Sequence, residues 1–566
     1  MKRIIFFLLI FAFVGSISAT TIHVPQGGDI ALYIRQAREM HRLHEVGSQE
    51  TINIVLDGDE YILSSPLYLR QEDSFLKISS PHSARISSKA VIRGWKKEGK
   101  FWVAEAPNAG TRPLRIRQLY VNGQKALRST QFGNYEMQRM TDFRTKERSI
   151  IIPTPENLSQ LQRENALEML VHQRWAIAIL RVKSIERCQD DTLQTQVTFL
   201  EPESELEFSH PWPQPVIGEE KGNSSFCLQN AKCLVDEQGE WYQDNDGRIW
   251  YLPKEGEKIE DTEIACATLE QLVEISGTAT RAVHHITFEN ICFEYASWNR
   301  PSDFGHVTLQ GGFPIVDAYK LGKEGLPWDK NLENQAWILR PVSAVTASWG
   351  QHINFYGCTF RHLSSTALDY SYAMKDCIVS NNRFEDIGGT AILGGWFGEG
   401  EEVHIPIRLP DAEYTTDLFI KGNTIYDATN EDWGAVGIGL GYVRSCHITE
   451  NEVSKVNYSG ICVGWGWTAD DTGMRDNHIV NNHITDFARM LYDAGGIYTL
   501  SNQPHSEITS NTIEHLGKAP YATNDRGFYI YLDAKTDGYT ISGNHCTEQR
   551  FGDNHPGKDI IWKENN

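Results

Sequence analysis

The sequence lacks a long hydrophobic run after its first twenty residues. No later stretch contains 18 consecutive apolar residues, whereas a helix needs about 20 to cross the hydrocarbon core of a bilayer. We therefore expect no membrane insertion of the mature chain.

Basic runs are also missing. The 53 basic and 74 acidic residues give a formal net charge of −21, and the only consecutive basic pair near an end is Lys2 with Arg3. Proteins that bind nucleic acid or anionic membranes present basic patches to the phosphates. This balance excludes nucleic acid as an expected partner.

Several familiar catalytic motifs are absent. The chain has no G-x-S-x-G, no H-E-x-x-H and no Walker loop, and no C-x-x-C metal pair. A glycine-rich stretch at 460–466 has no helix after it and belongs to a repeat, which argues against nucleotide binding. Dense clusters of Asp on successive repeats, as a Ca²⁺ site would need, are missing too. We expect no metal and no cofactor.

Ten cysteines are few for 566 residues, but in an exported chain they raise the question of disulfide bonds. Most occupy otherwise apolar positions of short repeated segments, where a small buried thiol fits. We expect mainly free thiols, and Cys227 with Cys233 as the bridged pair if any bridge exists.

The N-terminus has the pattern of an export signal. A basic pair at 2–3 precedes an apolar segment at 4–14, and small residues at 16–19 suit cleavage after Ala19. We expect a signal peptide at 1–19 and a periplasmic or secreted protein of bacterial type, acting as a monomer.

An asparagine recurs with a regular period in the C-terminal half. Short alternating segments, each with one Asn, place these residues at 423, 451, 482, 511 and 544, spaced by 28, 31, 29 and 33. Such a period indicates a solenoid, and period-two alternation indicates strands. The sequence predicts an all-β, right-handed parallel β-helix in which the Asn sits at a tight turn and bonds to its counterpart one rung away. Inward stacking is expected for Ile479, Ile508 and Ile541.

The repeat pattern is interrupted once. Residues 20–96 contain an amphipathic helix at 29–44, expected to cap the solenoid, followed by the first coils. Residues 97–265 lose the period and predict an inserted, sandwich-like β domain, with a strand over 167–185 and a hairpin at 240–253 turning at Asn-Asp-Gly. Residues 266–566 form the main solenoid with the cleft, and long excursions at 298–340 and 396–417 suit functional loops.

Aromatic side chains gather where the second strand of each repeat ends. We aligned these strands by their leading glycines, at 389, 460, 496 and 527. Indole and phenol rings stack on the apolar faces of sugars, so the sequence predicts a sugar groove along this edge. Its expected binding residues are Trp396, Trp433, Trp465, Trp467, Tyr498, Asn502 and Tyr531.

Carboxylates accompany this edge. Asp493 precedes a double glycine, Asp386 occupies the equivalent place in an earlier repeat, and Asp533 follows the strand after Phe528. Glycoside hydrolysis uses a general acid and a second carboxylate. Aligned by glycine, Asp493 and Asp533 lie nine strand positions apart, about 30 Å if extended, so both must curl round turns. Asp525 is the alternative partner for Asp493.

Four segments carry a family resemblance. They are Gln-Leu-Tyr-Val-Asn-Gly-Gln-Lys-Ala at 118–126, the hairpin at 239–253, Asp-Ala-Gly-Gly-Ile-Tyr-Thr-Leu at 493–500, and Gly-Phe-Tyr-Ile-Tyr-Leu-Asp at 527–533. In these the chain resembles glycoside hydrolase family 141. The resemblance implies an exported β-helix enzyme with an inserted β domain, acting on fucosides or xylan, with catalytic aspartates at Asp493 and Asp533. Related chains tend to have glycine at the position of Ala494 and an acidic residue at that of Ala534, differences that bear on the substrate.

The leading hypothesis is therefore an exported glycoside hydrolase of plant-cell-wall-type polysaccharide or oligosaccharide. Two alternatives stay open at this stage. A polysaccharide lyase or epimerase would need a Lys or Arg base beside an acidic sugar and, in many cases, Ca²⁺. A non-catalytic carbohydrate-binding solenoid would bind sugar without releasing reducing ends, and would tolerate loss of Asp493.

Overall fold

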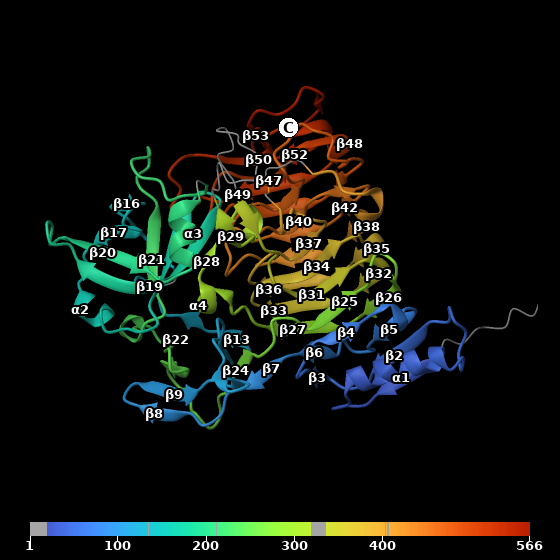
Figure 1. Ribbon diagram of the computed structural model, residues 1–566, viewed down its shortest axis with the longest axis horizontal. Coiled ribbons are helices and arrows are strands. Elements are labelled where there is room, and N and C mark those ends of the chain that lie inside the picture. Colours follow the sequence, from blue (N-terminus) through green and yellow to red (C-terminus); the bar gives the residue numbers. More distant parts are fainter. Residues whose placement is uncertain (1–19, 134, 211, 319–335, 402, 404–406) are drawn as a thin grey trace, which may run out of the picture.

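The computed structural model describes residues 20–133, 135–210, 212–318, 336–401, 403 and 407–566. The expected signal peptide lies outside these ranges. In the part of the chain described, no helix combines the length and the apolar character needed to cross a membrane. Figure 1 shows a tall stack of strands with a second β body at its side.

The stack is a parallel β-helix built from three sheets, as predicted from the repeat. Every pairing between neighbouring rungs is parallel, for example β45 with β48 and β48 with β51. The first sheet contains β1 (Thr21–Val24), β2 (Ile52–Leu56), β5 (Leu76–Ser79), β26 (Val283–Glu289), β32 (Gly350–Tyr356), β35 (Lys375–Ser380), β38 (Thr415–Lys421), β41 (Val443–Arg444), β42 (His447–Thr449), β45 (His478–Val480), β48 (Asn502–Thr509), β51 (Asp537–Ser542) and β54 (Ile561–Lys563).

The second sheet provides the strands that lead toward the cleft described below. Its members are β4 (Leu67–Leu69), β25 (Val273–Ser276), β31 (Ser343–Ser348), β34 (Thr366–Tyr372), β37 (Ile392–Gly394), β40 (Ile438–Leu440), β44 (Ile461–Val463), β47 (Ala494–Thr499), β50 (Gly527–Leu532) and β53 (Phe551–Asp553).

The third sheet completes each rung. It contains β3 (Glu60–Ile62), β6 (Arg85–Ser87), β27 (Cys292–Ala296), β33 (Thr359–Leu363), β36 (Arg383–Ile387), β39 (Thr424–Tyr426), β43 (Glu452–Ser454), β46 (His483–Phe487), β49 (Thr512–Leu516) and β52 (His545–Cys546).

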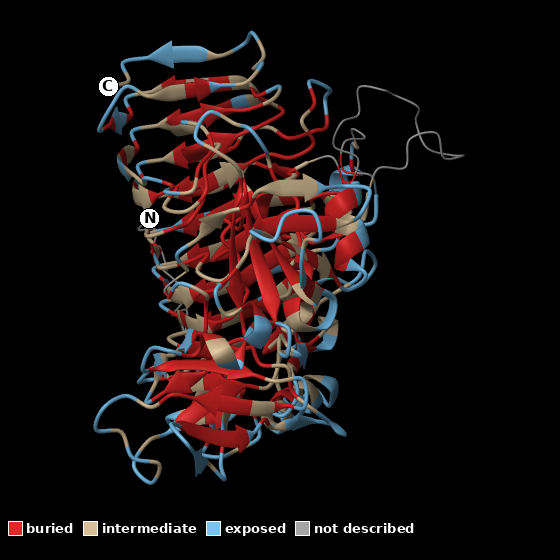
Figure 2. Ribbon diagram, turned by 90° about the vertical axis from the view of Figure 1, so that its left-hand side faces the viewer, coloured by how far each residue is buried: buried red, intermediate tan, exposed pale blue. Residues whose placement is uncertain are grey.

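Apolar side chains stack rung on rung inside the solenoid. Ile479 pairs in register with Ile508, and Ile508 with Ile541. All three side chains are fully buried, which confirms the predicted stack. Figure 2 shows the buried residues running through the strands of both bodies, with exposed residues at turns and at the last strand. This continuous burial is the main source of solenoid stability.

The predicted asparagine ladder is present and is longer than expected. Each amide Nδ2 donates to the Oδ1 of the Asn on the next rung, at 2.9 Å from Asn423 to Asn451 and from Asn451 to Asn482. The ladder continues through the same kind of bond over Asn382, Asn511, Asn544 and Asn565. The left-handed conformation at this turn belongs to the residue before each Asn, such as Glu450 and Ser510, and not to the Asn itself.

Helix α1 (Ile30–Arg42) closes the N-terminal end of the stack. The Asp29 side chain accepts a hydrogen bond from the Ala31 N–H, which caps the helix. Ile30, Ile34 and Ala37 are buried against the first coils. The helix covers strands that would otherwise leave backbone groups unpaired, in agreement with the predicted cap.

The inserted body lies beside the solenoid, at the left in Figure 1. One of its sheets has β15 (Gln138–Arg139), β21 (Ser225–Gln229), β18 (Glu168–Gln173), β19 (Ala176–Arg187), β20 (Gln194–Phe199), β17 (Ser149–Pro153) and β16 (Asp142–Arg144), with β28 (His306–Val307) added on β19. A second has β14 (Leu127–Arg128), β22 (Glu240–Gln243), β23 (Arg248–Tyr251), β9 (Phe101–Glu105) and β8 (Lys96–Glu98).

Smaller elements complete this body and its connections. A four-stranded sheet joins it to the solenoid through β13 (Gln124–Lys125), β12 (Tyr120–Val121), β24 (Ile264–Ala267) and β7 (Lys89–Val91). Two short hairpins pair β10 (Asn108–Ala109) with β11 (Arg112–Pro113), and β29 (Ile315–Ala318) with β30 (Ala336–Ile338). The remaining helices are α2 (Leu158–Leu161), α3 (Glu203–Ser209), α4 (Arg300–Phe304), and the 3-10 turns η1 (Gln71–Asp73), η2 (Lys232–Leu234), η3 (Gln310–Gly312) and η4 (Asp411–Glu413).

Two local expectations for the inserted body had different outcomes. The hairpin of β22 and β23 is confirmed, and Gly247 at its turn has a φ of +90°. The single strand expected over 167–185 is wrong. The chain instead reverses at Arg174 and Trp175, so that β18 and β19 pair as an antiparallel hairpin.

All ten cysteines are free, and seven of them are buried. Cys227 and Cys233 are not bridged. The repeat cysteines, such as Cys358, Cys377 and Cys446, occupy the solenoid core as small apolar side chains.

Candidate active site

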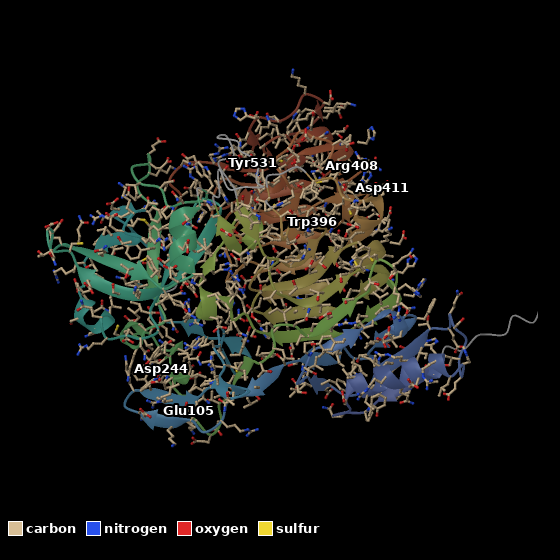
Figure 3. All side chains as sticks on the ribbon, viewed as in Figure 1. Glu105, Asp244, Trp396, Arg408, Asp411 and Tyr531 are labelled. Carbon is tan, nitrogen blue, oxygen red and sulfur yellow. The ribbon has the colours of Figure 1, made fainter. Side chains whose placement is uncertain are left out.

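A cleft of about 570 Å³ lies where the upper rungs of the solenoid meet the inserted body. Strands β47 and β50 supply one wall, and Figure 3 labels Tyr531 on this part of the stack. Asp493 and Asp533 both line it. These are the two carboxylates predicted from the sequence, and the fold brings them into one cleft.

Asp493 stands immediately before β47 and is largely shielded, with 14% of its side chain exposed. Its Oδ1 accepts hydrogen bonds of 3.0 Å from Arg526 Nε and from the Tyr531 hydroxyl. Its backbone carbonyl accepts a third, also 3.0 Å, from the Tyr458 hydroxyl. Among the described residues none donates to Oδ2, which leaves that oxygen available to a substrate.

Asp533 stands immediately after β50 and is buried. The Tyr498 hydroxyl donates to its Oδ2, and Asn554 Nδ2 donates to its Oδ1 at 2.7 Å. Its backbone N–H donates to the Thr499 carbonyl at 2.9 Å. Two donors on a buried carboxylate satisfy its acceptor oxygens and fix its orientation.

The hydrogen bonds of the two aspartates cross between the rungs. Tyr498 and Tyr531 are register partners on β47 and β50, and their rings meet edge to face with centroids 5.3 Å apart. Tyr498, on the strand that follows Asp493, bonds Asp533, whereas Tyr531, on the strand that precedes Asp533, bonds Asp493. The pair of tyrosines therefore links the two carboxylates.

The register explains how two distant positions share a cleft. Gly527 pairs with Ala494 and not with Gly496, so the predicted glycine alignment is wrong by two residues. Asp493 and Asp533 are thus seven register positions apart instead of nine. Asp493 has a φ of +58°, and a Cβ on Gly495 would lie 2.6 Å from the Ile497 carbonyl oxygen, so the backbone here is bent closely enough to require glycine at 495.

Burial raises the pKa of Asp493, because the cleft wall removes water from its charged form. The Arg526 guanidinium opposes this shift, the negative charge of Asp533 adds to it, and the Tyr531 hydrogen bond opposes it; the net pKa is above the ordinary value for Asp. A carboxyl with a raised pKa is suited to hold a proton for a leaving group.

Burial also raises the pKa of the three cleft tyrosines, Tyr458, Tyr498 and Tyr531, with the nearby aspartates contributing. Their hydroxyls therefore keep their protons at neutral pH. Tyr498 and Tyr531 each donate a hydrogen bond to an aspartate side-chain oxygen. Tyr458 donates to the backbone carbonyl of Asp493.

The far wall of the cleft comes from the inserted body, and sequence analysis missed it. Arg174 and Trp175 form the turn between β18 and β19, and Trp212 stacks on Trp175 with ring centroids 5.9 Å apart. The Arg174 guanidinium lies 4.8 Å from the Trp212 ring centroid and pairs with Glu219 at 3.0 Å. Three consecutive polar residues, His172, Gln173 and Arg174, inside the otherwise apolar run at 169–180 were the available signal for this turn.

The excursion at 298–340 contributes to the cleft as well. Leu309 and Gln310 line it, and Gln310 Nε2 donates to the Tyr458 hydroxyl at 3.0 Å. Because Tyr458 in turn donates to the Asp493 backbone carbonyl, this excursion is linked to the backbone of Asp493 through two hydrogen bonds. Its residues 319–335 lie outside the described ranges.

Of the predicted sugar-binding residues, three line the cleft: Trp467, Tyr498 and Tyr531. Four do not. Trp433 and Trp465 are buried at 4% and 3% exposure, the first in the solenoid core and the second among Phe313 and Phe397.

The other two lie elsewhere along the stack. Trp396 packs on Tyr442, with ring centroids 5.6 Å apart, and Figure 3 shows it well below Tyr531. Asn502 donates from Nδ2 to the Ala469 carbonyl. For Trp465 the physical reason is that Phe313 and Phe397, from the two excursions, pack on its ring, so that the ring belongs to a core and does not line a groove.

The alternative carboxylates are also placed outside the cleft. The Asp525 side chain is 78% exposed and forms an ion pair with Lys221. Asp386 accepts from Lys125 Nζ at 2.7 Å and bonds His362 at 2.8 Å, in the contact between the inserted body and the solenoid.

Two further observations narrow the choice of site. The described residues include no group of three or more His, Cys, Asp or Glu side chains arranged to hold a metal ion. A larger hollow of about 850 Å³ lies beside α1 at the opposite end, where Arg38 binds Asp73 through two 2.8 Å bonds and the Tyr61 hydroxyl donates to the Val24 carbonyl. The cleft at Asp493 is the better candidate for chemistry.

Comparisons with known proteins agree with this assignment. The model of the GH141 insertion domain matches residues 99–254, and that of the right-handed β-helix region matches residues 412–555. A solved structure described as "Glycoside hydrolase" is 35% identical, covers 97% of this chain and 96% of its own, and superposes with a TM-score of 0.91. A second, "The complex structure of XylC with xylose", is 10% identical over 94% of this chain and 70% of that one, with a TM-score of 0.47. No curated protein matches the sequence.

The identity and coverage of the first of these structures, together with the insertion-domain match, assign the enzyme class. A carboxylate pair in a cleft with an aromatic wall is what glycosidic hydrolysis requires. The chain belongs to the glycoside hydrolases, as a right-handed β-helix that carries a GH141 insertion domain.

Proposed function

We propose that Asp493 and Asp533 are the catalytic carboxyl pair of this glycosidase. The observation that carries the proposal is their placement in one cleft, linked by the crossed bonds of Tyr498 and Tyr531. Glycosidases need two carboxyl groups held on either side of the scissile bond, and the tyrosines fix both side chains.

In this proposal Asp493 is the general acid. Its raised pKa allows it to keep a proton, which passes from the carboxyl to the glycosidic oxygen as the bond to the anomeric carbon breaks. Its Oδ2 is the oxygen without a described donor, so it is the atom positioned to carry that proton.

Asp533 is then the second carboxylate. It either attacks the anomeric carbon or takes a proton from the water that does so, and the anomeric configuration of the first product distinguishes these routes. Tyr498 and Asn554 hold its two oxygens, an arrangement that supports a charged carboxylate at the moment positive charge develops on the sugar ring.

For the substrate we propose a fucoside or xylan-like glycan of plant-cell-wall type. The family resemblance supports this choice, and so does the indole wall of Trp175, Trp212 and Trp467. Fucose has a methyl group and xylose has no carbon at the position where hexoses carry a hydroxymethyl group, so both present an apolar edge to such a wall. Aryl α-L-fucosides, aryl β-D-xylosides and intact pectin form the test panel, with product analysis by mass. Cleavage of neither fucosides nor xylosides by active enzyme would overturn the substrate assignment.

The carboxylate roles are tested with Asp493→Asn, Asp533→Asn and the matched control Asp525→Asn. Asn keeps the shape and removes the titrating group, so each cleft variant should lose roughly 10³-fold or more in kcat while its Tm stays near the wild-type value. Asp525→Asn should retain activity, because that side chain is exposed outside the cleft.

A leaving-group series separates the two roles. Aryl glycosides with a 2,4-dinitrophenyl group need little protonation, so they should restore much of the rate in Asp493→Asn and none in Asp533→Asn. Full activity in Asp493→Asn on all substrates would remove this residue from the mechanism.

A further inference from the structure

A second hollow adjoins the cleft. It measures about 290 Å³ and lies between the upper rungs and the loop at 517–526. Arg526 lines both spaces, so the second hollow begins on the other side of the residue that holds Asp493. A glycan bound with its scissile bond at Asp493 and Asp533 therefore has this hollow within reach of a neighbouring sugar residue.

The rim of the hollow is cationic. Lys221, Lys518, Arg526 and Arg550 line it, against Asp525 and Glu548. This excess of positive charge stands out on a chain whose net charge is −21. A local cationic rim on an acidic protein attracts anionic ligands to that spot.

Two of these cations have no carboxylate partner. Lys221 pairs with Asp525, and Arg526 pairs with Asp493 at 3.0 Å. Lys518 and Arg550 form no ion pair within the described part of the chain, and Arg550 Nη2 donates only to the backbone carbonyl of Asp525. Their charges are therefore available to a ligand.

The floor of the hollow suits a sugar ring. Tyr492, Ala519 and Ala522 form a small buried apolar cluster there, and Tyr529 lies beside it. An apolar and aromatic floor beneath a charged rim matches a pyranose ring that carries an acidic substituent.

We infer that this hollow is a subsite for an anionic sugar residue next to the one cleaved. The anionic group is a carboxylate or a sulfate ester, and Lys518 and Arg550 bind it. This inference rests on the proposed function, since it takes Asp493 and Asp533 as the point of cleavage. Such a subsite makes the enzyme selective for fucosides or xylosides that are attached to an acidic sugar residue.

The test compares matched substrates. Glucuronoxylan and pectic fragments are set against their carboxyl-reduced forms, and sulfated fucan fragments against their desulfated forms. Wild-type enzyme should show a lower KM for the anionic member of at least one pair, and that preference should shrink in about 1 M NaCl, where the screening length is about 3 Å. The pair that shows the preference identifies the anion as carboxylate or sulfate.

The double variant Lys518→Gln/Arg550→Gln should raise KM for the anionic member roughly fivefold and leave the neutral member unchanged. Lys558→Gln, at an exposed position outside both hollows, is the control and should change neither. Calorimetric binding of the same fragments to Asp533→Asn gives a readout that needs no turnover. Equal KM and equal binding for charged and neutral members in the wild type, or an equal loss on both in the double variant, overturns the subsite while leaving the catalytic pair intact.

Discussion

At the residue scale, the chemistry of the cleft depends on competing influences on Asp493. Burial and the charge of Asp533 favour its protonated form, whereas Arg526 and the Tyr531 hydroxyl favour its charged form. The balance leaves the pKa raised, so small changes in these neighbours should shift the pH range in which the general acid keeps its proton.

Arg526→Met tests this balance. Loss of the guanidinium removes an influence that lowers the pKa of Asp493, so that pKa should rise further. A general acid is active only while protonated, and activity falls as pH rises through its pKa. The basic limb of kcat/KM against pH should therefore move to higher pH in this variant.

The profile of Lys558→Gln serves as the comparison, because Lys558 is exposed and lines neither the cleft nor the second hollow. Its basic limb should coincide with that of the wild type. A shift of the Arg526→Met limb to lower pH would mean that Asp493 is not the acid.

At the element scale, the asparagine ladder stabilises the turn between the first and third sheets. Asn482 Oδ1 accepts from both the backbone N–H and the Nδ2 of Asn451, at 3.0 and 2.9 Å. Its own Nδ2 donates to Asn511 Oδ1 and to the Ile448 carbonyl. One side chain thus satisfies buried groups on the rung before its own and on the rung after it.

Asn482→Ala should lower the free energy of unfolding by about 3 kcal/mol, because the buried Asn451 N–H and the Ile448 carbonyl lose partners. Urea denaturation measures this change as a lower midpoint of unfolding at an unchanged m-value. Glu452→Ala, at an exposed position of β43 one rung earlier, is the control and should change stability by less than about 0.5 kcal/mol. An equal effect of the two substitutions would mean that the ladder contributes no specific stability.

The repeating elements could be predicted from the sequence, whereas the elements outside the repeat were harder to predict. The spacing of Asn423, Asn451 and Asn482 defined the solenoid because each rung must present the same group at the same turn. The register at Gly527 was missed because Gly527 pairs with Ala494, so the leading glycines of β47 and β50 are not equivalent positions.

The candidate site was predictable to the same extent. Asp493, Asp533 and their tyrosines lie on repeat strands and could be chosen by position. Trp175 and Trp212 come from irregular sequence some 300 residues away and meet the cleft only through tertiary packing. Trp433 and Trp465 were assigned to the groove because the pattern of a strand end does not reveal which loop covers it.

At the scale of the whole molecule, the cleft has two walls that belong to different bodies. The inserted body contacts the solenoid through polar groups, including His172 Nε2 to the Met490 carbonyl at 2.8 Å and Arg139 to the Tyr521 carbonyl at 2.8 Å. The position of Trp175 in the cleft wall therefore depends on how firmly the two bodies are held together.

Lys125 is the central charge of that contact. From β13 it reaches Asp386 at 2.7 Å and Glu431 at 3.3 Å on the solenoid, and Asn430 Oδ1 accepts from it at 2.8 Å. Burial lowers the pKa of Lys125, but Asp386 and Glu431 raise it more. In turn burial raises the pKa of Asp386, but Lys125 and His362 depress it well below its usual range. Both groups are therefore charged at neutral pH.

Lys125→Met should loosen this contact. The substitution leaves Asp386 and Glu431 shielded without their cation, which typically costs about 3–5 kcal/mol when a buried pair is broken. Because the folded-state pKa of Asp386 is depressed, its contribution is present above the unfolded pKa of about 3.9 and is lost as pH falls through the folded value. The difference in Tm between variant and wild type should thus be large at pH 7 and smaller at pH 3.

The KM of Lys125→Met should rise at pH 7 as the indole wall shifts. The control Lys183→Met, at an exposed position on β19, should change neither Tm nor KM. Unchanged KM with a lowered Tm would show that the inserted body keeps its place over the cleft without this ion pair, and that its other contacts suffice to hold the wall.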